Sequence, residues 1–272
     1  MDLFESGTES DELITRARVQ FPVDSERVIG LAPLDIEEAS VLLSDQIFNV
    51  TSKLRDSPVT AGFLNMRNHI AAMRSEAVVE AFCNLDYVFA DGVGLQIVRG
   101  LLKLPPFRRV SGTDTVPAVL RKLAAINGRV FLLGGTPRVS ARSASNLATL
   151  FPGLKVVGHH HGFLESISID RIVAQINASG CDLLLIGMGT PCQELWLQRY
   201  KQEINAKLAV CVGGLFSYWS GDLVRAPEIF RTCGMEWLWI LVQQPAKWRI
   251  YTLDAFDFLR RVIRITRGLR PR

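Results

Sequence analysis

Glycines stand at the ends of several apolar runs in this sequence, a pattern suited to binding an anion. The clearest case is the stretch 187–194, Gly-Met-Gly-Thr-Pro-Cys-Gln-Glu, which directly follows the apolar run 183–186. Backbone without side chains can approach phosphate oxygens closely, and the start of a helix adds the positive end of its dipole. Glycine pairs also follow apolar runs at 134–135 and 213–214. Together these turns predict a site for a phosphate-bearing ligand.

Asp91 is the carboxylate best placed to take a proton from a reacting group. It stands between Ala90 and Gly92, directly after the apolar run 87–90. Open α/β sheets bind ligands at the carboxyl ends of their strands, and a carboxylate there can act as a general base. Asp is also a common helix cap, so the structural alternative for Asp91 is to cap a helix that begins near Val93. The two roles are compatible.

The composition excludes several classes of protein. The 272 residues are 48% apolar, enough for one large domain or two small ones. No apolar run approaches the roughly 20 residues that span a bilayer, and residues 1–12 have no basic and apolar regions of a signal peptide. The five cysteines form no CxxC pair, which indicates a reducing compartment. The motifs GxGxxG, GxxxxGK[ST] and GxSxG are absent, which argues against nicotinamide binding, a P-loop and a serine hydrolase.

Expected strands and helices alternate along the chain. A mainly parallel, Rossmann-like α/β sheet covered by helices on both faces follows from this alternation and from the nearly continuous apolar strands. Two consecutive prolines make 104–111 a loop. The expected strands are 28–31, 59–64, 87–90, 130–133, 155–157, 183–186 and 208–212, and the expected helices include 36–48, 68–84 and 93–101.

The two ends of the chain differ from this α/β domain, which is expected at 27–236. Residues 1–26 are polar and aperiodic and are expected to form a flexible acidic leader. Residues 237–272 are expected to form a basic helical appendage, since the chain from Arg225 onward holds ten Lys/Arg and four Asp/Glu. Apolar residues recur at helical spacing in 253–267, with arginines between them. Either this helix packs on the protein, or it lies on an anionic membrane, which the neighbouring tryptophans favour.

An ordered series of motifs resembles the WecG/TagA/CpsF glycosyltransferases, glycosyltransferase family 26. The resemblance covers residues 28–251. Its main motifs are DGVG from Asp91, RxxGTD from Arg109, GxGxPxQE from Gly187, Arg225-Ala226-Pro227 and Glu236-Trp237-Leu238.

The resemblance implies an inverting, metal-independent transfer of a sugar from a UDP-sugar to a polyprenyl-diphosphate-linked glycan acceptor. In the family this reaction builds cell-surface polysaccharide, such as exopolysaccharide, at the cytoplasmic face of the membrane. The resemblance implies a cytoplasmic protein that is peripheral on the inner face of the membrane and reaches it through the basic appendage. It implies no cofactor, and it leaves open whether the protein forms a homo-oligomer. A nucleic-acid partner is not expected, because no nucleic-acid recognition fold is evident.

The residue types agree with such a transfer. One base must take the acceptor proton, and the departing UDP carries negative charge that arginines, backbone amides and helix ends can meet. A metal site is not expected, because the chain has no DxD motif. The catalytic candidates are Asp91, Arg109 and Gln193. The candidate substrate contacts are Asn65, Asn68, Gly112, Thr113, Gly134, Gly135, Gly187, Gly189, Thr190, Glu194, Gly213, Gly214 and Arg225.

Several of these candidates have a structural alternative. The alternative for Arg109 is a loop residue in a salt bridge, and the alternative for Arg225 is an ion pair. Asn65 and Asn68 can cap a turn as well as bind sugar hydroxyls. Asp114 opens the next expected helix and is better explained as a cap than as a second acid.

The histidines at 159–161 resemble a metal site only in composition. Neighbouring side chains of an extended segment point to opposite faces, so three consecutive histidines do not converge on one ion. Metal binding is therefore not expected there.

Four residues depart from the family pattern: Phe63, Cys192, Ser217 and Ile240. They fall in motifs expected near the donor sugar and its diphosphate, so N-acetylmannosamine, glucose and a uronic acid all stay open as the transferred sugar. The departures also leave open a degenerate module that binds a nucleotide-sugar or a lipid-linked glycan without turnover.

Overall fold

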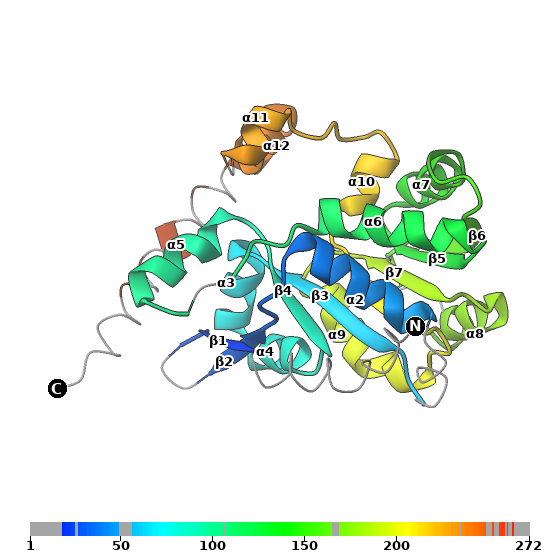
Figure 1. Ribbon diagram of the computed structural model, residues 1–272, viewed down its shortest axis with the longest axis horizontal. Coiled ribbons are helices and arrows are strands. Elements are labelled where there is room, and N and C mark those ends of the chain that lie inside the picture. The colour runs from blue at the N-terminus through cyan, green and yellow to red at the C-terminus, as the bar shows by residue number, and fades with distance from the viewer. Residues whose placement is uncertain are drawn as a thin grey trace, which may run out of the picture.

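The computed structural model describes residues 18–24, 27–48, 56–105, 107–164, 169–233 and 235–248, with residues 252, 256–258, 260 and 263. In these residues a six-stranded parallel sheet forms the centre of the molecule (Figure 1). Its strands are β3 (Val59–Leu64), β4 (Tyr87–Ala90), β5 (Arg129–Gly134), β6 (Lys155–His160), β7 (Leu183–Gly187) and β8 (Leu208–Cys211). Their spatial order is β4-β3-β8-β7-β5-β6, and the predicted α/β fold is confirmed.

Helices cover both faces of the sheet. One face carries α2 (Ile36–Phe48), α6 (Gly112–Ala125), α7 (Pro137–Leu150) and α10 (Leu215–Trp219). The other carries α3 (Met66–Arg74), α4 (Glu76–Cys83), α5 (Val93–Leu102), α8 (Ile169–Ser179) and α9 (Cys192–Tyr200). The remaining elements are β1 (Val19–Pro22), β2 (Val28–Leu31), η2 (Lys201–Glu203), α11 (Glu228–Thr232), α12 (Glu236–Gln243) and η3 (Pro245–Lys247).

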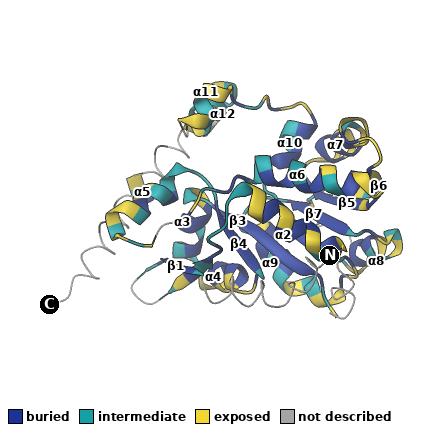
Figure 2. Cartoon of the chain, viewed as in Figure 1, coloured by how far each residue is buried: buried dark blue, intermediate teal, exposed yellow. Residues whose placement is uncertain are grey.

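Two apolar cores fill the space between the sheet and these helices. Within β7, Leu184 and Ile186 pack into the core under α8 and α9, whereas Leu183 and Leu185 pack into the core under α6 and α7. Successive strand residues point to opposite faces, so a strand covered on both sides must be apolar throughout. All five residues of β7 are buried, and Figure 2 shows the sheet as the buried centre of the molecule.

Part of the expected flexible leader is an ordered strand, so that prediction is wrong for residues 19–22. The strand β1 pairs antiparallel with β2, and Phe21 is fully buried. The Phe21 ring meets the His69 ring edge to face at 5.1 Å, and His69 Nε2 lies 2.8 Å from the Pro22 carbonyl oxygen. Buried Val19 and Phe21 with exposed Gln20 between them are a strand pattern. Residues 1–17 lie outside the described residues.

The single helix expected at 68–84 is instead two helices, α3 and α4. Ser75 between them is extended, with φ −147° and ψ 122°. It ends α3 through its N–H, which donates to the Ala72 carbonyl oxygen, and it precedes Glu76 in the first turn of α4. The Ser75 side chain makes no capping hydrogen bond, so the break lies in the extended backbone of Ser75, and Glu76 favours the start of α4 at the positive end of its dipole.

The part of the chain after α10 leaves the layered body. Figure 1 shows α11 and α12 above the sheet, joined to α10 by an extended connection. Helix α12 begins at Glu236 and contains the bulky apolar run 237–242. The helix expected at 253–267 lies mostly outside the described residues. Within the described residues, no helix has the length and apolar character needed to cross a membrane.

Candidate active site

The predicted site residues gather at the carboxyl edge, the edge of the sheet formed by the carboxyl ends of its strands. In the spatial order of the strands, the residues there are Asp91, Asn65, Gly213, Gly187 and Gly134. Strands β5 and β7 are neighbours in the sheet. From β5 the chain continues to β6 on one side of this pair, and from β7 it continues to β8 on the other side. Such a reversal between neighbouring parallel strands is the usual place for a ligand in an open α/β sheet.

The turns after β5 and β7 touch through bare backbone. The Gly135 N–H donates a 3.1 Å hydrogen bond to the Gly187 carbonyl oxygen. Gly134 has φ 146°, and a Cβ atom placed on it would lie 2.3 Å from the Gly187 carbonyl carbon. Only glycine fits at this crossing, because any side chain would push the two strands apart.

The turns after β7 and β8 are joined by the Gln193 side chain. The Gly213 N–H donates a 2.9 Å hydrogen bond to Gln193 Oε1, and Gln193 Nε2 donates at 2.7 Å to Glu194 Oε1. The Thr190 hydroxyl also donates to Glu194 Oε1, at 2.9 Å. We name the segments 134–135, 187–190 and 213–214 the glycine turns. Gln193 and Glu194, which are 2% and 0% exposed, join the turns 187–190 and 213–214 through these hydrogen bonds.

Glu194 is a buried acid whose second oxygen, Oε2, has no hydrogen-bond partner. Burial raises the pKa of this carboxyl, against the hydrogen bonds from Gln193 and Thr190 that lower it. Glu194 was predicted to contact substrate, and Gln193 to assist catalysis. The structure gives both side chains internal partners.

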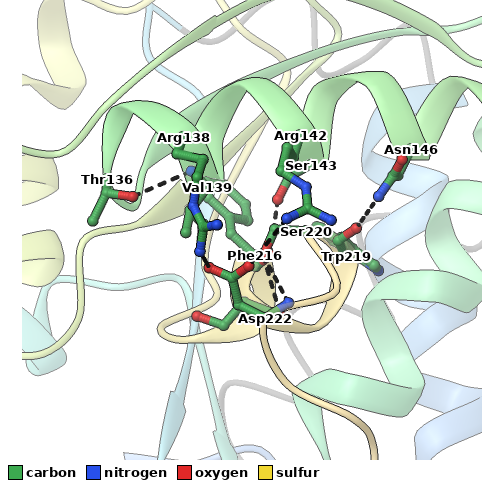
Figure 3. Close-up of polar contacts among 11 residues, drawn as sticks. Thr136, Arg138, Val139, Arg142, Ser143, Asn146, Phe216, Trp219, Ser220 and Asp222 are labelled. Atoms are coloured by element: carbon green, nitrogen blue, oxygen red, sulfur yellow. Dashed lines mark hydrogen bonds and ion pairs between the residues drawn. The ribbon is translucent and has the colours of Figure 1, made fainter.

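Helix α7 holds α10, the helix that follows the turn at 213–214. Along one face of α7, Ser143 Oγ donates at 2.8 Å to the Phe216 carbonyl oxygen, and Asn146 Nδ2 donates at 2.7 Å to the Trp219 carbonyl oxygen (Figure 3). These bonds satisfy backbone oxygens of a short helix that has few of its own. Exposed ion pairs at 2.9 and 3.5 Å then join Arg138 and Arg142 to Asp222.

Asp91 lies at the far end of the carboxyl edge, after the edge strand β4. Its N–H donates a 2.8 Å hydrogen bond to the Leu64 carbonyl oxygen of β3, which continues the strand pairing by one residue. The N-cap of α5 is Gly92, with φ 85°, so Asp91 is not the cap residue that the sequence allowed. The residue is half-buried.

Asp91 holds its proton far more tightly than an ordinary aspartate. The pKa of Asp91 is raised from 3.8 to about 7, chiefly by burial among protein atoms and then by the nearby carboxylates Glu236 and Asp114. The Arg109 guanidinium and a backbone hydrogen bond from Gly92 lower it. A carboxyl with this pKa can change its protonation state near neutral pH, as a general base must. We name Asp91, Arg109, Asp114 and Glu236 the Asp91 group.

Glu236 was not predicted as a site residue, although it begins the motif Glu236-Trp237-Leu238. It lies in the first turn of α12, which is 145 residues after Asp91 in the sequence. Only the structure shows that the start of this helix is close enough to influence the Asp91 carboxyl. The signal in the sequence that could have identified Glu236 is its place as the acidic residue that begins this motif.

The predicted arginines lie in contacts between segments. Arg109 Nη2 donates at 3.3 Å to the Arg231 carbonyl oxygen at the end of α11. Arg225 forms an ion pair with Asp114 and donates at 3.2 Å to the Thr113 hydroxyl at the start of α6. The ion-pair alternative for Arg225 therefore fits the structure. Together the two arginines tie the chain after α10 to the neighbourhood of Asp91.

Asn65 has the capping role that the sequence left open, and the Asn68 side chain has a backbone partner in β3. Asn65 is the N-cap of α3, where its Oδ1 accepts a 3.0 Å hydrogen bond from the Asn68 N–H. Asn68 Nδ2 donates at 2.8 Å to the Phe63 carbonyl oxygen. The Phe63 ring is buried, lies 5.6 Å from the Phe89 ring, and sits 3.2 Å from where a Cβ on Gly112 would be. Phe63 is thus a core residue under the start of α6.

The three histidines lie at the end of β6 and beyond it. His159 Nδ1 lies 3.2 Å from the Ser140 hydroxyl, and His160 Nδ1 lies 2.7 Å from the His161 carbonyl oxygen. In the part of the chain that the structure describes, no group of three or more His, Cys, Asp or Glu is placed to hold a metal ion.

The carboxyl edge therefore carries two groups of predicted residues. The Asp91 group lies at β4, and the glycine turns lie at β8, β7 and β5. Strands β3 and β8 stand between β4 and β7, so the strand ends at Asp91 and Gly187 are about 14 Å apart at the usual strand spacing. This arrangement suits a long ligand that lies along the edge.

A model of the "Glycosyl transferase WecG/TagA/CpsF family" matches residues 31–272 of this chain. The chain belongs to this glycosyltransferase family. It is similar to an N-acetylglucosaminyldiphosphoundecaprenol N-acetyl-β-D-mannosaminyltransferase from Bacillus spizizenii, with 32% identity over 189 residues that cover 69% of this chain and 70% of the relative. As a member of the WecG/TagA/CpsF glycosyltransferases, the chain is an enzyme.

Proposed function

We propose that this chain is an inverting, metal-independent glycosyltransferase that moves a sugar from a UDP-sugar to a polyprenyl-diphosphate-linked glycan. The observation that carries the proposal is Asp91, whose place directly after β4 and pKa of about 7 suit a general base at the carboxyl edge. Sequence motifs on both sides of it belong to a glycosyltransferase family. A general base is what a single displacement at a sugar carbon requires.

The proposed step is one displacement. Asp91 takes the proton of the acceptor hydroxyl while the acceptor oxygen forms a bond to the anomeric carbon of the donor. The bond between that carbon and the β-phosphate oxygen breaks at the same time, and the electron pair leaves with UDP. Attack opposite the leaving group inverts the anomeric configuration. The proton remains on Asp91 until solvent removes it.

The glycine turns and Arg109 are proposed to meet the negative charge of the diphosphate. Backbone N–H groups at bare turns approach phosphate oxygens without obstruction, and Arg109 adds a permanent positive charge beside Asp91. The sequence has no DxD motif to hold a metal ion against the diphosphate. Gln193 and Glu194 support this cradle by joining the turns at 187–190 and 213–214.

The acceptor is proposed from the similar Bacillus enzyme, whose name gives undecaprenyl-diphosphate-linked N-acetylglucosamine as the acceptor and N-acetylmannosamine as the transferred sugar. A lipid-linked acceptor requires the enzyme to work at a membrane surface. We propose a peripheral association with the inner face, made through the basic C-terminal appendage. Apolar side chains stand exposed there, with Trp237 48% and Val242 68% exposed.

The test is UDP release by the purified chain, with UDP-linked N-acetylmannosamine, glucose and a uronic acid offered in turn with an undecaprenyl-diphosphate-linked N-acetylglucosamine acceptor. We expect release with one donor, a product of inverted configuration, and no loss of rate on addition of a chelator. Loss of the rate with the chelator, or a retained configuration, would contradict the mechanism. Tight donor binding without release would favour the degenerate binding module instead.

A further inference from the structure

Helices α11 and α12 stand clear of the layered body (Figure 1), yet the start of α12 lies beside the proposed base. Every residue of both helices is exposed or half-buried. Apolar packing against the body therefore contributes little to their placement, because its stabilisation grows with the area that is buried. The place of Glu236 near Asp91 depends on polar contacts instead.

The Gln243 side chain closes the α11–α12 segment at its base. Its Oε1 accepts a 2.7 Å hydrogen bond from the Val224 N–H, and its Nε2 donates at 2.8 Å to the Val224 carbonyl oxygen. The Trp239 indole N–H donates to the same carbonyl oxygen at 3.1 Å. Both polar backbone groups of one residue before α11 are thus bound by side chains of α12.

This pairing needs the chemistry of glutamine. A primary amide presents an acceptor and a donor side by side, as the N–H and carbonyl oxygen of Val224 require. An ionised glutamate of the same length would accept from the N–H but could not donate to the carbonyl oxygen. Methionine is similar in size and has only a weakly accepting sulfur. Replacing Gln243 by methionine therefore removes both bonds while keeping the length of the side chain.

Val224 connects this closure to the body of the protein. It directly precedes Arg225, whose guanidinium is paired with Asp114 near the start of α6. Asp114 is one of the charged residues of the Asp91 group. The hydrogen bonds at Val224 thus fix the base of α12 next to the ion pair that ties this segment to the body.

Further contacts inside the closed segment carry this placement to its tip. The Phe230 and Trp239 rings, whose centroids lie 5.6 Å apart, join α11 to α12. The Arg231 carbonyl oxygen at the end of α11 accepts the 3.3 Å hydrogen bond from Arg109. Glu236 begins α12 directly after this point, so the direction of α12 decides where its carboxylate lies.

We propose that Gln243 is a positioning residue for the reaction, which binds both backbone groups of Val224 and so holds α12 with Glu236 beside Asp91. Without these bonds, α12 loses its attachment at the base and Glu236 moves away from Asp91. The inference rests on the proposed function for its consequence, because only a base at Asp91 makes the place of Glu236 matter to the rate. Its physical basis is the pair of bonds at Val224.

The test compares Gln243→Met with the wild type in the pH dependence of UDP release. Glu236 and Asp114 raise the pKa of Asp91, whereas Arg109 lowers it. We expect the acid limb of kcat/KM to move to lower pH in Gln243→Met, toward the position that it has in Glu236→Gln. The matched control is Gln202→Met, the same change at an exposed residue of η2, which should leave the limb in place.

A double variant tests whether Gln243 acts through Glu236. If it does, Gln243→Met combined with Glu236→Gln has the same acid limb as Glu236→Gln alone, since the charge that α12 positions is already gone. Shifts that add would overturn the proposal. Circular dichroism and melting temperature confirm that each variant is folded. Trp239→Phe, which removes one bond at Val224 and keeps the ring, replaces Gln243→Met if that variant is unfolded, and a smaller shift in the same direction is then expected.

A measurement without turnover separates this inference from the proposed function. NMR titration of carboxyl-labelled aspartate follows the protonation of Asp91 directly, and Asp91→Asn identifies its signal. We expect Asp91 to titrate at lower pH in Gln243→Met than in the wild type. An unchanged titration overturns the positioning role. If the wild type releases no UDP with any donor, the proposed function fails, and the titration still decides whether Gln243 places Glu236.

Discussion

Gly213 and Gln193 are twenty residues apart in the sequence, and a 2.9 Å hydrogen bond from the Gly213 N–H to Gln193 Oε1 joins them. The bond links the turns after two neighbouring strands, β7 and β8. Through Glu194, the same network reaches the Thr190 hydroxyl. Gln193 and Glu194 therefore position the backbone of the glycine turns, which is proposed to bind the diphosphate. Their effect on the reaction is indirect, because they act by holding that backbone in place.

Replacing Glu194 tests this positioning role. Glu194→Gln keeps an oxygen that can accept from Thr190 and Gln193, so we expect near wild-type stability and a small change in KM for the donor. Glu194→Ala removes the acceptor from both donors, and each unsatisfied buried group costs about 1–3 kcal/mol. We expect a lower melting temperature and a higher KM for the donor, measured by thermal unfolding and UDP release. Equal behaviour of the two variants would mean that the hydrogen bonds do not matter.

Removing the proposed base is the direct test of the mechanism. We expect Asp91→Asn to lower kcat by about 10²–10⁴-fold, the range that a general base contributes. Affinity for UDP, measured by calorimetry, should stay close to that of the wild type, because the amide has the size of the acid. A parallel loss of UDP affinity and kcat would show that Asp91 supports the fold of the site and not the proton transfer.

The pH dependence of the reaction should follow the Asp91 carboxyl, which must be ionised to accept a proton. We expect kcat/KM to rise with pH through an apparent pKa of about 7. Glu236→Gln removes a charge that raises the pKa, so its acid limb should move to lower pH. Arg109→Gln removes a charge that lowers the pKa, so its limb should move to higher pH. Shifts in the same direction for both variants would contradict the assignment.

The raised pKa of Asp91 also has a cost in stability. Between its ordinary pKa of 3.8 and about 7, the folded state binds the proton more tightly than the unfolded state, so the stability from this group falls as pH rises through that window. Asp91→Asn removes the cost. We therefore expect the variant to melt at a higher temperature than the wild type at about pH 8, with the difference vanishing toward about pH 4. A constant difference across this range would exclude the linkage.

The order of glycines and apolar runs was enough to predict the parallel sheet and to place Asp91, Gly134, Gly187 and Gly213 at strand ends. These features depend on local sequence: buried strands are apolar throughout, and their turns need glycine. The spatial order of the strands, in contrast, does not depend on local sequence. Nothing in the sequence places β8 beside β3, and that pairing determines which turns are neighbours.

Contacts between distant segments could not be read from the sequence. Arg225 was open as an anion contact or an ion pair, and only the fold brings it to Asp114, 111 residues away. The influence of Glu236 on Asp91 has the same origin. The motif that contains Phe63 predicts a place near the donor sugar. In the structure the Phe63 ring instead packs under Gly112 and belongs to the core. Side-chain partners set by tertiary packing decide these roles.

The crossing of β5 and β7 provides a last prediction. A Cβ on Gly134 would lie 2.3 Å from the Gly187 carbonyl carbon, and φ 146° is a conformation that other residues rarely adopt. Backbone on both sides cannot move aside without breaking the bond from the Gly135 N–H to the Gly187 oxygen. We expect Gly134→Ala to lower the free energy of unfolding by more than about 3 kcal/mol, combining overpacking with backbone strain. The control is Gly100→Ala on α5, where a Cβ meets no atom within 4 Å and the change should stabilise the helix by about 0.5–1 kcal/mol. Urea denaturation measures both, and a Gly134→Ala variant as stable as Gly100→Ala would show that the two turns do not need the close approach.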